Sequence, residues 1–102
     1  MNEEQIVKYF DLIKSDYKIF LSFLKAKYPF FHNSNFFFRD LQFGISKYLE
    51  KKGIRISNSL AEELAKKTSS FLEEEKIFIK INPRSWRINY PEFVTTVQGD
   101  PL

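Results

Sequence analysis

The segment Ile77–Tyr90 constrains the fold of this chain most strongly, because apolar and polar residues alternate on both sides of a predicted turn. If Asn82–Ser85 forms the turn, a β-hairpin brings residues 77–81 opposite residues 86–90. The facing pairs are then Ile81 and Trp86, Ile79 and Ile88, and Ile77 and Tyr90. All six side chains are apolar and share one face, since side chains alternate along a strand. The sequence therefore predicts a hairpin with one face on a core, anchored by Trp86.

The opposite face of this predicted hairpin is basic. It carries Phe78, Lys80, Arg87 and Asn89, with Arg84 on the turn. Like charges placed opposite each other destabilise a hairpin, so Lys80 beside Arg87 favours a face that receives an anion. No acidic residue occurs between Lys76 and Tyr90, whereas Glu73–Glu75 lie just upstream. The alternative is a solvated face whose charges keep an edge strand from aggregating.

Length and composition limit the classes of protein to consider. The chain of 102 residues has the size of one domain that can bury a core. The chain has no cysteine, which excludes disulfides and zinc–thiolate sites. Its net charge of +3 is too small to indicate, by itself, that the protein binds a polyanion. The N-terminus lacks the apolar run of a signal peptide, and the longest uncharged stretch, Tyr28–Phe38, is too short for a membrane span. We therefore expect a cytoplasmic protein without a membrane partner.

Residues Glu3–Lys27 have the periodicity of one long helix. Apolar residues recur at steps of three and four, at Ile6, Phe10, Ile13, Tyr17, Phe20 and Leu24. A second stripe, about a third of a turn away, consists of Leu12, Ile19 and Phe23. Ser15 and Asp16 could cap a new helix and divide this one. Pro29 disfavours helical geometry at Tyr28, so the helix should end there.

A second helix is predicted over Phe36–Lys52, with Gly53 as its C-terminal stop. Its inner face consists of Phe37, Phe38, Leu41, Ile45, Tyr48 and Leu49. Phe36 and Phe43 fall on the opposite, charged side. Either the first helix covers them from outside, or they form a subunit interface with Leu12, Ile19 and Phe23. We favour the interface, and hence a homodimer, because so short a chain offers few further layers.

The third helix follows a short predicted strand, Ile54–Ile56, and is capped by Ser57 or Asn58. Its inner stripe consists of Leu60, Ala61, Leu64, Ala65, Thr68, Phe71 and Leu72. Its outward residues are Ser59, Glu63, Lys66, Lys67 and Ser70. The sequence thus predicts an α+β, mostly helical fold with three helices and a C-terminal hairpin.

This arrangement resembles a winged helix-turn-helix domain. The resemblance covers roughly residues 36–90 and implies a winged-helix-like domain at 35–93, a helical extension at 1–28 that could serve dimerisation, and a flexible tail at 94–102. It also implies double-stranded DNA as partner and a role in transcription regulation. In such domains the third helix typically enters the major groove, and the hairpin wing touches the backbone or the minor groove.

Carried onto this chain, the resemblance implies nucleic-acid contacts from Arg55, Ser59, Lys66, Lys67, Ser70, Lys80, Arg84 and Arg87. The third helix differs from a typical recognition helix in one respect. Arg, Asn and Gln are the side chains that best recognise base edges, and Asn58 is the only one of these in the helix. Glu73–Glu75 would also repel DNA unless the N-terminal half of the helix enters the groove. The alternative function is a protein-interaction module that binds no DNA and uses the aromatic residues of the first two helices.

Nothing in the sequence groups residues for catalysis. His32 is the only histidine and has no nearby acids, so it predicts no metal site. The three glycines, at positions 44, 53 and 99, are too far apart to form a phosphate-binding loop. The sequence also does not group serine, histidine and aspartate residues as a nucleophilic site would require. We therefore expect no enzyme, no cofactor and no small-molecule substrate.

Overall fold

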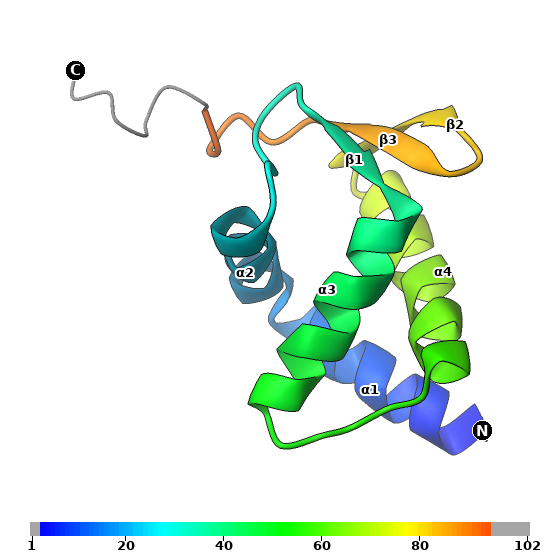
Figure 1. Cartoon of the computed structure of the whole chain (residues 1–102). Coiled ribbons are helices and arrows are strands. Elements are labelled where there is room, and N and C mark those ends of the chain that lie inside the picture. Colours follow the sequence, from blue (N-terminus) through cyan, green and yellow to red (C-terminus); the bar gives the residue numbers. More distant parts are fainter. Residues whose placement is uncertain (1–2, 95–102) are drawn as a thin grey trace.

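The computed structural model describes residues 3–94, which form four helices and a three-stranded antiparallel sheet (Figure 1). The elements are α1 (Glu3–Ser15), α2 (Tyr17–Lys27), β1 (Asn35–Phe37), α3 (Phe38–Lys51), α4 (Asn58–Glu74), β2 (Phe78–Asn82) and β3 (Ser85–Ile88). The expected α+β, mostly helical class is confirmed, but the helices number four and not three. Residues 95–102, most of the predicted tail, lie outside the described residues.

The predicted long N-terminal helix is divided at Asp16, which is the N-cap of α2. Its carbonyl oxygen accepts hydrogen bonds from the backbone nitrogens of Ile19 and Phe20, at 3.0 and 3.1 Å. After this break α1 packs on α4 and α2 packs on α3. The wide apolar surface of the segment is therefore divided between two packing partners. α2 ends at Lys27, and Tyr28 is its C-cap with extended backbone geometry, as expected from Pro29.

The sheet contains a strand, β1, where the sequence predicted a connector and the start of a helix. β1 pairs with β3, which gives the strand order β1-β3-β2, and Ile54–Ile56 forms no strand. Phe36 lies opposite Trp86 and is 1% exposed, so it is a core residue and the prediction of an interface role was wrong. A strand alternates its faces, so β1 buries Phe36 and exposes Phe37.

The hairpin of β2 and β3, which we call the wing (residues 78–88), turns at the predicted place but in another register. The observed pairs are Phe78 and Ile88, Ile79 and Arg87, Lys80 and Trp86, and Asn82 and Ser85. The register shifts between Lys80 and Asn82, because Ile81 is an extra residue that forms a bulge. Phe78 consequently faces the core and Ile81 is exposed. The predicted pairing of two cations was therefore wrong, since Lys80 lies opposite Trp86.

One aromatic core joins the helices to the sheet. The ring of Phe36 packs against those of Tyr28, Phe30 and Phe78, with ring centroids 4.8–6.1 Å apart. From the N-terminal helices, the same core contains Ile13, Phe20, Leu21 and Leu24. The segment 1–28 was expected to be an extension, but its helices α1 and α2 contribute to the core of the unit that follows them. No helix within residues 3–94 is long and apolar enough to cross a membrane.

Candidate nucleic-acid interface

Helix α4 carries four of the eight predicted contact residues, namely Ser59, Lys66, Lys67 and Ser70. Ser57, one of the two caps that the sequence predicted, is the N-cap of α4, and its Oγ accepts a hydrogen bond from the backbone nitrogen of Leu60 at 3.1 Å. The helix buries Leu64, Thr68 and other residues of the predicted inner stripe. Lys66 and Ser70 are exposed and one turn apart, so they form a stripe along the outer face of α4.

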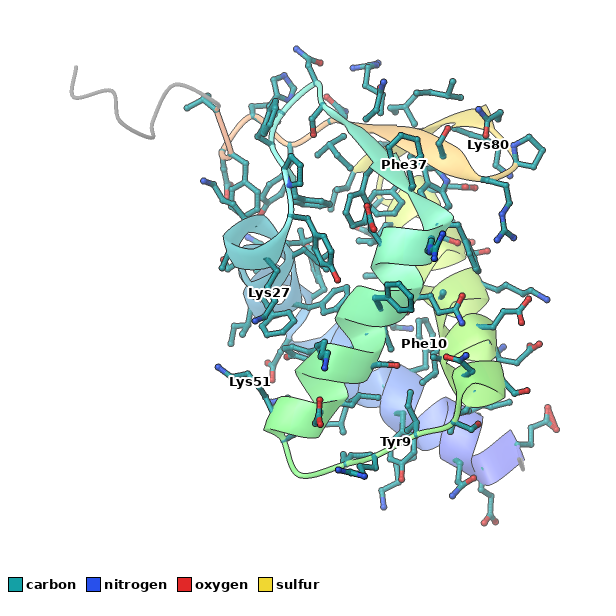
Figure 2. All side chains as sticks on the ribbon, viewed as in Figure 1. Tyr9, Phe10, Lys27, Phe37, Lys51 and Lys80 are labelled. Carbon is teal, nitrogen blue, oxygen red and sulfur yellow. The ribbon has the colours of Figure 1, made fainter. Side chains whose placement is uncertain are left out.

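A groove of about 250 Å³ separates α4 from the wing, and we call it the wing groove. Its polar lining consists of Lys66, Ser69, Ser70, Glu73, Lys80 and Arg84. Four of the eight predicted contact residues therefore meet at one place, namely Lys66, Ser70, Lys80 and Arg84. Figure 2 labels Lys80 on the wing, which follows the C-terminal end of α4.

Arg84 holds the tip of the wing against the start of α3. Its carbonyl oxygen accepts a hydrogen bond of 2.9 Å from the backbone nitrogen of Phe38, the first residue of that helix. Its guanidinium carbon lies 4.5 Å from the centre of the buried Phe38 ring. This cation–π contact restrains the side chain while leaving its charge available to an anion. Among residues 3–94, no carboxylate forms an ion pair with Arg84.

The other two cations of the wing groove are paired with carboxylates. Lys80 Nζ lies 3.9 Å from Glu73 Oε2, and Lys66 Nζ lies 3.6 Å from Glu63 and 4.0 Å from Glu62. All three pairs are solvent-exposed to a large degree. Such pairs contribute about 0–1 kcal/mol each, so exchanging a carboxylate for a phosphate costs little.

The remaining predicted contact residues lie elsewhere. Lys67 lines a second groove between α1 and α4. Arg55 lies in the connection between α3 and α4, and Ser59 in the first turn of α4. Arg87 occupies the face of β3 opposite to Trp86, where its Nη1 donates a hydrogen bond of 2.9 Å to Asn33 Oδ1. The structure therefore brings four residues together and separates four from them.

Of the five predicted protein-interface residues, only two are largely exposed. Ile19 is 60% and Phe43 45% exposed, while Leu12 and Phe23 are partly buried against the core. The sequence prediction missed Phe37, which is 49% exposed at the N-cap of α3. It also missed Arg39, whose guanidinium carbon lies 5.7 Å from the centre of the Phe43 ring. The i, i+4 spacing of Arg39 and Phe43 was a usable signal for their contact.

The lone histidine has a structural partner, since His32 Nδ1 accepts a hydrogen bond of 3.0 Å from the backbone nitrogen of Tyr90. Within the described part of the chain, no three acidic or histidine side chains are grouped to hold a metal ion. In comparisons with known proteins, no family model, no curated protein and no solved structure matches the chain. The function of this protein must therefore be inferred from its own surface, and in particular from the wing groove.

Proposed function

We propose that this protein binds double-stranded DNA through α4 and the wing, as a transcription regulator located in the cytoplasm. The observation that supports the proposal most strongly is the wing groove, where Lys66, Lys80 and Arg84 meet the Ser70 hydroxyl between a helix and a hairpin. Lysine, arginine and hydroxyl side chains are the usual partners of DNA phosphates. The role is one of binding, without catalysis or a cofactor.

The arrangement of elements also supports this proposal. The order β1-α3-α4-β2-β3 places one long helix beside a hairpin that follows it directly, as a winged helix-turn-helix domain requires (Figure 1). Phosphate contacts would supply most of the affinity, because α4 has few side chains that read base edges. We therefore expect modest sequence selectivity that depends partly on DNA shape.

Fluorescence anisotropy of a labelled mixed-sequence duplex, repeated over a salt series, tests the proposal. The variant Lys80→Gln with Arg84→Gln should bind more weakly and lower the slope of log affinity against log salt by about 2, since each lost phosphate contact removes about 0.9. The matched control is Lys18→Gln with Lys51→Gln, which removes the same charge from α2 and the end of α3. Absence of binding by the native chain at low salt would contradict the proposal.

A second candidate function is a protein-interaction module, and the exposure of Phe37 and Phe43 on one segment favours it. These two rings flank Arg39 in the sequence, so a partner with apolar and acidic side chains would match them. For the DNA-binding function, in contrast, we propose a homodimer that forms through α2, because Ile19 offers an exposed apolar side chain there. Sedimentation equilibrium of the native chain and of Ile19→Lys tests the dimer, which the substitution should dissociate.

A further inference from the structure

The second groove, between α1 and α4, is also lined by cations. It measures about 450 Å³, and its charged lining consists of Lys14, Lys66, Lys67, Glu63 and Glu74. Phe10, Phe71 and Ser70 complete the lining. We call it the α1–α4 groove. Figure 2 labels Phe10 on α1, the helix that forms one wall.

Lys14 is held over the aromatic side of this groove. Its Nζ lies 5.4 Å from the centre of the Phe10 ring and 5.7 Å from that of Phe71, and these two rings meet edge to face. Within residues 3–94, neither Lys14 nor Lys67 forms an ion pair. Contact with two rings restrains the ammonium group without neutralising it. An anion in the groove would therefore meet two cations that need no release from a carboxylate.

The two grooves lie on either side of the stripe formed by Lys66 and Ser70, and both residues line both grooves. Ser69 and Glu73 extend the stripe toward the wing, whereas Lys67 and Phe71 extend it toward α1. The outer face of α4 is thus flanked by cations on both sides. This is the pattern that a helix in a DNA major groove needs, because that groove is about 12 Å wide and is bordered by two phosphate backbones.

We propose that the α1–α4 groove is a second phosphate-contact site, in which Lys14 and Lys67 contact the DNA backbone strand opposite to the one contacted by the wing. This inference rests on the proposed function and adds α1, a helix outside the winged-helix resemblance, to the interface. It assigns a binding role to Lys14, and it assigns Lys67 to a different backbone strand from Lys80 and Arg84.

The lining favours a polymer backbone over a small ligand. The groove volume falls within the range of about 300–1,000 Å³ for small-molecule sites, but those sites are mostly apolar with a few convergent polar groups. Here every charged lining residue except Glu63 is largely exposed, and Glu63 is half-buried. Glu63 and Glu74 oppose an anion, yet Glu63 is engaged by Lys66 at 3.6 Å. Three lysines against two glutamates leave the lining cationic.

The anisotropy assay described above, with the same duplex and salt series, tests the second site with a new variant, Lys14→Gln with Lys67→Gln. It should weaken binding and lower the salt slope by about 2, as the wing variant does. Combining both pairs should lower the slope by about 4, because contacts to separate backbone strands are independent. Lys67→Gln alone, at an exposed position, should lower the salt slope by about 1. This single variant tests the site if the Lys14 substitution disturbs the aromatic packing.

The outcomes separate this inference from the proposed function. If the Lys14/Lys67 variant binds like the Lys18/Lys51 control while the wing variant is impaired, the second site is wrong and DNA binding through the wing stands. If the native chain binds no duplex at low salt, both proposals fall. If both variants lose affinity and slope to a similar degree, α4 is contacted by phosphates on both sides.

Discussion

The indole nitrogen Nε1 of Trp86 donates a hydrogen bond of 2.8 Å to Oε2 of Glu73. Trp86 is 2% exposed, so this carboxylate satisfies the single polar atom of a core side chain. The same oxygen lies 3.9 Å from Lys80 Nζ. Glu73 therefore links the wing to the last turns of α4 and, at the same time, reduces the positive potential of the wing groove.

Substitution of Glu73 separates these two effects. Glu73→Gln keeps an oxygen acceptor for Trp86 but removes the negative charge beside Lys80. We expect the free energy of unfolding to change by less than about 1 kcal/mol, because a neutral hydrogen bond replaces a charged one. DNA affinity should rise several-fold at low salt, as measured by anisotropy. Unchanged affinity would indicate that DNA does not approach the wing groove.

Glu73→Ala should be compared with Glu73→Gln, because the alanine variant leaves the buried indole nitrogen of Trp86 without a hydrogen-bond acceptor. The unsatisfied group should lower the free energy of unfolding by about 1–3 kcal/mol, measured by urea denaturation. Equal stability of the alanine and glutamine variants would mean that the hydrogen bond does not stabilise the wing.

Phe36 and Phe43, which the sequence analysis placed on the same face, should contribute differently to the free energy of unfolding. Phe36→Ala removes a side chain that packs on three aromatic rings in the core and should cost about 3–5 kcal/mol of unfolding free energy. Phe43→Ala removes a side chain that is 45% exposed and should cost less than about 1 kcal/mol. Urea denaturation of both variants provides the comparison, and similar costs would contradict the burial of Phe36.

Local signals predicted the boundaries of elements well. Ser57 caps α4, Pro29 follows the end of α2, and Gly53 after α3 has a φ of 82° that favours glycine. Each of these depends on one or two neighbouring residues. The sequence allowed either one continuous helix or a break near Asp16. Which of the two forms depends on the tertiary packing of α1 on α4.

Features that depend on distant residues could not be predicted. The run Phe36–Phe38 is apolar at every position, so periodicity alone cannot distinguish a strand from a helix start; its pairing with β3 decides. The bulge at Ile81 likewise inverts the faces of β2 without a local signal. Lys14 joins Lys67 only because α1 packs on α4, and its contribution to a site was therefore not visible in the sequence.

The hydroxyl of Tyr48 has no hydrogen-bond partner among the described residues although it is buried. Tyr48→Phe should therefore leave the free energy of unfolding at pH 7 unchanged or raise it by up to about 1 kcal/mol, because a buried unsatisfied group is removed. Urea denaturation of the native chain and the variant measures this difference. A loss of more than 1 kcal/mol would reveal a partner for the hydroxyl.

The same hydroxyl predicts how stability depends on pH. Burial raises the pKa of Tyr48, and the negative charge of Asp16 raises it further. A pKa that is higher in the folded than in the unfolded chain gives stability that is complete below the unfolded value of about 10 and is lost as pH rises through the folded value. Tyr48→Phe should reduce this alkaline loss. Part of it should remain, because burial also raises the pKa values of Tyr28 and Tyr90.

Gly44, in the middle of α3, allows α2 to approach closely. A Cβ atom at this position would lie 2.5 Å from Leu24 Cδ2 and 3.5 Å from Tyr28 Cε2. Alanine would gain about 1 kcal/mol in helix propensity. Leu24 is fully buried, however, so overpacking should cost about 1–3 kcal/mol, and we expect Gly44→Ala to lower the free energy of unfolding.

A double-mutant cycle with Leu24→Ala identifies the cause of this loss. Leu24→Ala removes the atom that the new methyl group would meet, so Gly44→Ala should be neutral or stabilising in that background. The coupling between the two substitutions should exceed about 0.5 kcal/mol, as expected for residues in direct contact. An equal cost of Gly44→Ala in both backgrounds would mean that Leu24 does not limit the approach of α2, and that the loss arises from Tyr28 or from α3 itself.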